Sequence, residues 1–428
     1  MDSYDRPTVL IPKVWPHVPD STTDIATNVS EIAWWTQYHS DELNELILKA
    51  LKQNNNLQIA IAKTQYAQSQ LNSVKLNWLP GLSLLAGQSQ FPIFGNPGAF
   101  FIAAPLYIVN IIQQYKEQKG AEAIKQASMD AKDCVKLLII AEVSASFFTL
   151  ISQQDTLNLY KKLLHDYQTQ LHLAQTKYRS GLISPDDIDQ IKAQIKETRS
   201  QIAITQHNIN VVKNTLHFLL NEDPGELIIK TSFKDLNTNQ LIPGDLPLTV
   251  LNNRPDIREA DALLRAAHHN VGATAANLLP SITLGAYLGK GSTINGRTIN
   301  ATEFYVDTPI INLPVFAQIS ASKAQQKAAG LNYINTVRGA LRDVDNDLSA
   351  YTAFTDQYNT NLSAYQNKKQ QCHWVELRFK NGINDNTDIV KCHITLHQFE
   401  LVLNQNKLEK MKVIIKLYQD LGGGYHGV

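Results

Sequence analysis

The sequence is poor in charge. Among its 428 residues, Lys and Arg number 39 and Asp and Glu number 39, so the net charge is zero and charged residues make up only 18%. A neutral chain lacks the electrostatic field of a general nucleic-acid binder, and we predict no nucleic-acid partner. Asn and Gln supply the polarity instead. That composition suits a surface beside lipid or a wide aqueous lumen, although a soluble protein with an amide-rich surface shares it.

Cysteine and long apolar runs are scarce too. The three cysteines, Cys134, Cys372 and Cys392, are too few and odd in number for a disulfide framework. No run approaches the roughly 18 to 20 apolar residues of a membrane-spanning helix. The opening residues, MDSYDRPTVLIPKVWPHVPD, lack the basic-then-apolar order of an export signal. The chain is therefore either cytoplasmic or the mature form of an exported protein.

Motifs for catalysis are missing. The sequence contains no nucleophile elbow, no phosphate-binding loop and no HExxH helix. The segment GKGSTING, from Gly289, has glycines without the Walker order, and it is typical of an exposed hairpin loop. We predict that the protein is not an enzyme and has no catalytic, cofactor-binding or metal site.

The chain contains an internal repeat. Shifting the sequence by 200 positions aligns a segment that begins at Asn54 with one that begins at Arg254. The glycine of YRSGLISPDDI, Gly181, recurs 201 positions later as Gly382 in FKNGINDNTDI. Two distant matches at nearly one offset indicate a duplicated unit. Matching residues include Ala60 and Ala260, Ala62 and Ala262, Ala67 and Ala267, Leu79-Pro80 and Leu279-Pro280, and Leu84 and Leu284.

Long stretches contain no helix breaker. Neither Ala121–Ser180 nor Asp186–Asp223 contains glycine or proline, and no proline follows Pro314. These stretches far exceed a typical globular helix of about 11 residues. Apolar residues step by three and four on both sides of Gly181 and, less regularly, of Gly382, which predicts two antiparallel coiled-coil hairpins. The seam residues include Leu157, Tyr160, Leu164, Tyr167, Leu171, Ala174, Tyr178, Ile188, Ile191, Ile195, Leu348, Tyr351, Cys372, Ile389 and Cys392.

Four short runs alternate between apolar and small or polar residues. They are Pro80–Phe91, Ala99–Val109, Ser281–Gly289 and Glu303–Pro314. Soluble β-hairpins have this pattern, but so do tilted membrane strands of about ten residues. Membrane strands must close on themselves, and bacterial barrels start at about eight strands. One copy cannot close alone, so the membrane interpretation requires an oligomer of unspecified number.

One segment carries a family resemblance. NNRPDIREADALLRAAHHNVGATAANLLPSITLG, from Asn252 to Gly285, resembles the outer-membrane efflux protein family of TolC-like channels, in its drug-efflux branch. The paired turns at Gly181 and Gly382 and the terminal LGGGYH from Leu421 match as well. The resemblance implies a mainly α fold with a two-fold internal repeat, in which four β-strands per chain contribute to a trimeric 12-stranded barrel. Amide-rich helix faces would then line a water-filled tunnel.

The resemblance also implies function and partners. We expect an outer-membrane exit duct with helices in the periplasm, which passively conducts small molecules such as drugs. Its expected partners are two further copies of the chain, a periplasmic adaptor, an inner-membrane pump of the resistance-nodulation-division type and outer-membrane lipid. Two alternatives stay open: a type I secretion duct, and a soluble coiled-coil scaffold or adaptor.

The resemblance suggests a division of the chain into eight parts. They are an equatorial segment with the first helix (1–78), a β-barrel hairpin (79–112), a long helical hairpin (113–222), an equatorial linker (223–252), a repeat helix (253–278), a second β-barrel hairpin (279–314), a second long helical hairpin (315–420) and a tail (421–428).

The resemblance assigns roles to the two glycine turns. The adaptor would contact Gly181, Leu182, Ile183, Gly382, Ile383 and Asn384, and the pore would narrow at Asp187 and Asp388. First-turn helix capping is the alternative role of both aspartates. The tyrosine and arginine that often latch the closed state are replaced by Phe379 and Asn384, and Lys391 stands at a second acidic position. These three residues therefore argue against an inherited latch and against strong cation selectivity.

Thiols and imidazoles flank the second turn. Cys372-His373 and Cys392-His393 lie at similar distances from it, and His397 follows one helical turn after His393. Such a set suits zinc. Both cysteines also fall on seam positions, where a small apolar thiol packs well, and we favour packing.

Overall fold

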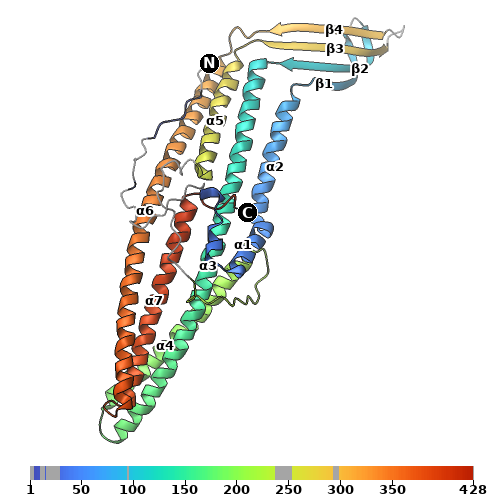
Figure 1. Ribbon diagram of the computed structural model, residues 1–428. Helices are drawn as coiled ribbons and strands as arrows, with labels where there is room; N and C mark the ends of the chain where they lie inside the picture. Colours follow the sequence, from blue (N-terminus) through green and yellow to red (C-terminus); the bar gives the residue numbers. More distant parts are fainter. Residues whose placement is uncertain are drawn as a thin grey trace. The chain divides into compact units, whose positions relative to one another are not determined.

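A computed structural model describes residues 4–9, 15, 29–93, 96–236, 253–292 and 298–427 (Figure 1). The chain divides into two compact units. Unit 1 comprises Met1–Leu10, Ile59–Lys132 and Pro255–Arg338, and unit 2 comprises Ile11–Gln58, Asp133–Arg254 and Gly339–Val428.

The described elements are mostly helical, as predicted. Two short 3-10 helices (Val29–Glu31 and Trp34–Tyr38) precede α1 (Asp41–Gln53). The remaining elements are α2 (Asn55–Leu76), β1 (Gly81–Ile93), β2 (Asn96–Val109), α3 (Ile111–Arg179), α4 (Pro185–Leu219), α5 (Pro255–Ala276), β3 (Ser281–Ser292), β4 (Thr298–Asp307), α6 (Leu313–Lys380) and α7 (Asn386–Asp420).

The predicted repeat is present in the order and the lengths of these elements. The series α2-β1-β2-α3-α4 recurs as α5-β3-β4-α6-α7. Helices α2 and α5 have 22 residues each, α3 and α6 have 69 and 68, and α4 and α7 have 35 each. Similar patterning alone would not fix matched lengths, so the chain carries two copies of one supersecondary unit.

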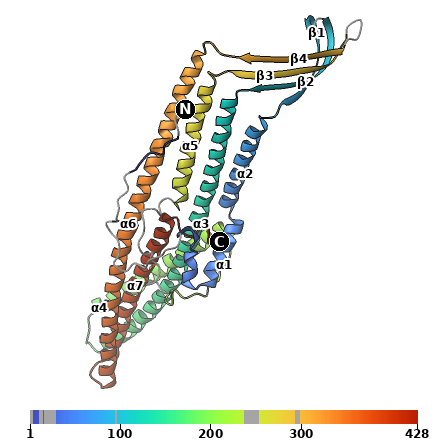
Figure 2. The same ribbon diagram turned by 45° about the horizontal axis from the view of Figure 1, so that its top comes forward.

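The strands of unit 1 form one antiparallel sheet in the order β1-β2-β3-β4 (Figure 2). Its centre joins the two repeats, because β2 pairs with β3 from Ala99 opposite Ser292 to Val109 opposite Ile282. Among the described residues, β1 and β4 each pair on one side only. The sheet therefore has two edges with unpaired backbone groups.

Two strand predictions need correction. The last strand was expected over Glu303–Pro314, but β4 runs from Thr298 to Asp307, because Pro309 and Pro314 cannot donate to a ladder. The loop expected over GKGSTING begins later, because β3 continues to Ser292. The rest of that loop lies outside the described residues.

One helix departs from the expectation about apolar runs. Within α3, an 18-residue window has a mean hydropathy of 2.0, and 56% of that window is buried inside the protein. A buried core helix meets the same criterion as a membrane span. The window is weak evidence for a helical span.

The core of unit 2 is aromatic and includes the C-terminal tail. Trp34 stacks on Tyr418 with ring centroids 5.2 Å apart, and Tyr38 packs against Phe148 at 4.6 Å. Gly424 lies so close to Trp35 that a Cβ atom would stand 2.7 Å from its ring. This approach explains the glycine at position 424 of the terminal LGGGYH motif.

The Arg-Pro-Asp motif contacts the same tail. The Arg254 guanidinium donates to the backbone oxygen of Asp420, and its Nη1 lies 3.6 Å from the Asp420 carboxylate. The Tyr425 hydroxyl donates to the backbone oxygen of Asn253 at 2.8 Å. Two of the motifs that carry the family resemblance thus bind each other.

In unit 1, the N-terminal segment is attached to α5 at Asp261. The hydroxyl of Tyr4 and the Nε of Arg6 donate to its Oδ1 at 2.6 and 2.9 Å, and Arg265 lies 3.3 Å from Oδ2. Burial opposes ionisation of this carboxyl, but the hydrogen bonds from Arg6 and Tyr4 keep the pKa of Asp261 below its ordinary value.

Candidate functional site at the two hairpin turns

The two hairpin turns of unit 2 close their helices in the same way. At the end of α3, Gly181 N–H donates to Tyr178 O at 2.8 Å and Leu182 N–H to Lys177 O at 3.0 Å. At the end of α6, Gly382 N–H donates to Phe379 O and Ile383 N–H to Arg378 O, both at 2.9 Å. This pattern is a Schellman motif, which needs a left-handed residue. Gly181 and Gly382 supply it with φ values of 72° and 71°.

The following helices start differently. Ser184 caps α4 in a capping box with Asp187, whose carboxylate accepts from the Ser184 N–H at 3.0 Å and from its hydroxyl at 2.8 Å. Pro185 occupies the first turn of α4. Helix α7 is capped by Asp385, whose side chain accepts from the N–H groups of Thr387 and Asp388.

The two predicted pore aspartates thus differ in environment. The bonds from Ser184 lower the pKa of Asp187, and the positive charge of Lys391 lowers it further. Asp187 is therefore a cap, and it lies within electrostatic reach of Lys391. The Asp388 carboxylate accepts no hydrogen bond from the described residues, because Asp385 provides the cap. Asp388 is half-buried in the first turn of α7.

Apolar side chains protrude from both turns. Leu182 is 72% exposed and Ile383 is 71% exposed. Phe379 is 41% exposed, whereas Ile183 and Asn384 are half-buried. Exposed aliphatic residues at the ends of two helical hairpins are suited to contact another protein.

Sequence reasoning missed a contact between the hairpins. Lys177, in the last turn of α3, forms an ion pair with Asp385 at 2.5 Å, which lowers the pKa of Asp385. The partners are 208 positions apart, so no local pattern reveals them. Both side chains are partly exposed, and such pairs contribute about 0–1 kcal/mol. The contact is weak enough to break and re-form.

A small core lies between the hairpins. It consists of Leu163, Tyr167, Ile195, Val390 and Ile394, from α3, α4 and α7. Tyr167 connects the same helices through polar atoms, because Gln398 donates to its hydroxyl at 3.2 Å. The predicted seams therefore bury their residues partly within a hairpin and partly between hairpins.

An acidic and aromatic cluster joins α6 to α7. Glu400 accepts from the Tyr365 hydroxyl at 2.9 Å and lies 3.3 Å from Nδ1 of His397. His397 also lies 3.4 Å from Asp166 of α3. The hydrogen bond from His397, with that from Tyr365, lowers the pKa of Glu400 from 4.5 to about 2.

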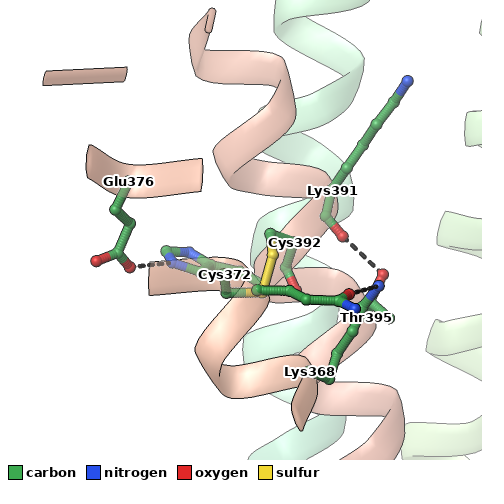
Figure 3. Close-up of a disulfide and its surroundings, with 8 residues drawn as sticks. Lys368, Cys372, Glu376, Lys391, Cys392 and Thr395 are labelled. Atoms are coloured by element: carbon green, nitrogen blue, oxygen red, sulfur yellow. Dashed lines mark hydrogen bonds and ion pairs between the residues drawn. A yellow bond between two sulfur atoms is a disulfide. The ribbon is translucent and has the colours of Figure 1, made fainter. Parts of the chain in front are cut away.

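Cys372 and Cys392 form a disulfide between α6 and α7 (Figure 3). Both residues are buried seam residues, as expected, but they are bonded rather than packed as thiols. The histidines are also engaged: His393 lies 3.6 Å from Glu376, and His397 contacts two carboxylates. The thiolates that a zinc site would need are therefore not available in this state.

The first hairpin has an aliphatic pair where the second has the disulfide. A shift of 201 positions places Leu171 and Ile191 opposite Cys372 and Cys392. Both are partly buried against the inter-hairpin core. At equivalent positions, the pair α3 and α4 thus has partly buried aliphatic side chains, whereas the pair α6 and α7 has a covalent bond.

Two copies of a helix-strand-strand-helix-helix unit, with an open sheet and paired glycine turns, define the class of TolC-like channel proteins. The profile of the outer membrane efflux protein family matches residues 46–222 and 246–423, once for each repeat. The chain belongs to this family. The family, fold class and outer-membrane location predicted from the sequence are confirmed, as is the role as the exit channel of an efflux system, and members of the family are channels rather than enzymes.

Curated relatives are similar along nearly the whole chain. The probable efflux pump outer membrane protein TtgC of Pseudomonas putida is 24% identical over 452 residues, which cover 99% of this chain and 92% of the relative. The cation efflux system protein CusC of Escherichia coli is 23% identical over 437 residues, covering 98% and 95%.

Solved structures share the fold. The open state of the Neisseria gonorrhoeae MtrE outer membrane channel superposes with a TM-score of 0.84 at 22% identity, covering 99% of this chain and 98% of that one. The outer-membrane channel OprN gives a TM-score of 0.82 at 19% identity, covering 99% of both chains.

The disulfide predicts a labelling pattern and a stability effect. Without reductant, alkylation of the unfolded protein should label Cys134 alone, because Cys372 and Cys392 are bonded. Replacing both with serine should lower the free energy of unfolding by about 3 kcal/mol, the loop-closure contribution for a separation of 20 residues. Peptide mapping and thermal unfolding in detergent measure these effects, with Cys134→Ser as the control. Labelling of Cys372 before reduction would contradict the assignment.

The Glu400 cluster predicts a pH-dependent stability. Because its pKa is lowered, ionised Glu400 stabilises the fold above its ordinary pKa of 4.5, and this is lost as the pH falls towards about 2. Glu400→Gln should cost about 1–2 kcal/mol at pH 7, less than full linkage because solvent reaches the site, and the difference from wild type should vanish near pH 2. Thermal unfolding between pH 2 and pH 7 tests this, with Glu409→Gln, at a half-buried glutamate on the same helix that pairs with Lys412, as control. A pH-independent difference would refute it.

Proposed function

We propose that three copies of this chain form a passive exit duct whose sheets close into one 12-stranded barrel in the outer membrane. The observation that carries the proposal is the sheet itself, since its four strands leave β1 and β4 with an unpaired side. Unpaired N–H and C=O groups in lipid cost several kcal/mol each. Pairing β1 of one copy with β4 of the next removes both edges.

We propose that the hairpin turns are docking points for a periplasmic adaptor. Leu182, Ile183 and Ile383 provide apolar contacts at the two turns, and Gly181, Gly382 and Asn384 shape them. The near-identical backbone of the two turns supports this role, because six equivalent turns in a trimer would offer a repeated surface. An inner-membrane pump of the resistance-nodulation-division type would supply the energy.

We propose that the pore narrows beside these turns. Asp388 is the better gate residue of the two aspartates, because its carboxylate has no capping role, and Phe379 and Lys391 lie on the same hairpin. The Lys177–Asp385 ion pair provides the contact between hairpins that Phe379 and Asn384 cannot make. Breaking that pair would allow the hairpins to separate.

The proposed cargo is small organic molecules. Relatives named for toluene and for antibiotic efflux favour it, while another is named for cation efflux. Soft metal ions prefer thioether and thiolate ligands. The chain has only three methionines, and two of its three cysteines are in the disulfide. Conduction of metal ions by ligand exchange along the chain is therefore poorly supported.

The domain boundaries form part of this proposal. The N-terminal segment of 1–78, before the first helix, would form an equatorial region with 223–252 and 421–428, and 79–112 and 279–314 would form the barrel strands. Residues 237–252 of the linker lie outside the described residues.

The turn glycines provide a matched test of adaptor docking. A Cβ at Gly181, Gly382 or the helical Gly339 would meet nothing within 4 Å, but only the first two have a positive φ. Gly181→Ala and Gly382→Ala should strain the turns by about 1 kcal/mol each and weaken efflux, whereas Gly339→Ala should not. Cellular dye efflux and photo-crosslinking from position 383 to periplasmic proteins measure the effect, and native mass spectrometry checks that trimers persist. Equal efflux and equal crosslinking in all three variants would contradict a role of the turns in adaptor docking.

Conductance of the purified protein in planar bilayers tests both the duct and its gate. Asp388→Asn should raise single-channel conductance or open probability, because a ring of three carboxylates near the axis is lost, and should leave the melting temperature unchanged. Asp187→Asn, the matched control, should lower helix stability through its capping box, with a smaller effect on conductance. If the purified protein forms no channels in the bilayer, the proposed function as a duct is wrong.

A further inference from the structure

Unit 1 contains a cavity of about 590 Å³ between α3, α5 and α6. Its apolar lining includes Ile112, Val271, Leu278 and Leu279. Its polar lining consists of Lys116, His268, Lys323, Gln326 and Asp5. The cavity therefore combines an apolar floor with two cations and one carboxylate.

Among the described residues, the two lysines of this cavity have no ion-pair partner. Within the described part of the chain, neither Lys116 nor Lys323 forms an ion pair or a hydrogen bond, whereas the neighbouring Lys119 pairs with Glu122 at 2.8 Å. His268 is engaged by Gln326 at 3.3 Å. Burial lowers the pKa of nearby His269, and the positive charges of Lys116, Lys119 and Arg265 lower it further. The local field is thus positive.

Gly272 leaves room for the side chain of Lys116. Three carbons of its side chain lie 3.1 to 3.3 Å from where a Cβ of Gly272 would stand. The missing side chain at position 272 lets the stem of Lys116 cross α5. Such stems cover apolar surface while the ammonium group stays accessible.

The cavity lies where the sheet meets the helices. Leu278 and Leu279 directly precede β3, and Ile112 lies in the first turn of α3, just after β2 (Figure 2). This inference rests on the proposed function, in which the sheet is the membrane-inserted part of the channel and its strand ends mark the level of the lipid headgroups. Unpaired lysines beside apolar side chains at this level match an anionic lipid.

We propose that this cavity binds the anionic headgroup of a membrane phospholipid, with Lys116 and Lys323 contacting the phosphate and the apolar floor receiving the start of an acyl chain. Asp5 disfavours a second negative charge nearby, so the fitting headgroup carries a single one, as in phosphatidylglycerol. This site would anchor the junction between strands and helices.

Native mass spectrometry of the delipidated full-length protein tests the site. The probes are phosphatidylglycerol, phosphatidylethanolamine with the same acyl chains, and inorganic phosphate. Wild type should retain phosphatidylglycerol about tenfold more strongly than phosphatidylethanolamine, and Lys116→Gln with Lys323→Gln should abolish that preference. Gly272→Ala, which keeps every charge but displaces Lys116, should reduce it. The matched control Lys119→Gln should not.

Three other outcomes would contradict the proposed lipid site. Equal retention of the two lipids, or an unchanged preference in the double variant, would remove the headgroup contact. The same loss in Lys119→Gln would show that only general surface charge matters. Competition by inorganic phosphate at equal concentration would identify a free-anion site instead of a lipid site. Melting temperatures of all variants should match wild type, which separates loss of binding from loss of fold.

Discussion

Backbone hydrogen bonding at the two sheet edges is the constraint on which the rest of the structure depends. One chain provides four strands, and β1 and β4 each leave a row of polar groups without partners among the described residues. Lipid contains no hydrogen-bonding partner for those groups, and in the proposed trimer the neighbouring copies would supply the partners. The duplication serves the same end, because pairing of β2 with β3 unites two hairpins in one continuous sheet.

The repeats have diverged where the hairpins turn. Both keep a glycine in the left-handed region and the same two hydrogen bonds. However, α4 begins with a serine capping box, while α7 begins with an aspartate that also pairs with Lys177. The second hairpin alone is closed by a disulfide. These differences leave Asp388 without the capping role that Asp187 performs.

Particular residues show how far the sequence could be followed. The positions of Gly181 and Gly382 and the equal spacing of the repeats were evident from the letters, because a tight helix reversal has a short local signature. The last strand was misplaced, because its alternation continued past Asp307 into residues that prolines exclude from a ladder. The cysteines were recognised as seam residues, yet their bond depends on α6 and α7 bringing them to a Cα separation of 5.6 Å.

By itself the sequence determined the long helices, the existence of four strands, the glycine turns and the family, because each rests on periodicity or on a motif that spans a few consecutive residues. Only the tertiary structure decided which of the two aspartates caps its helix, that Lys177 meets Asp385, and that Lys116 and Lys323, without an ion-pair partner among the described residues, line one cavity. Those facts depend on side chains far apart along the chain. Their approach is set by packing, which local patterns do not encode.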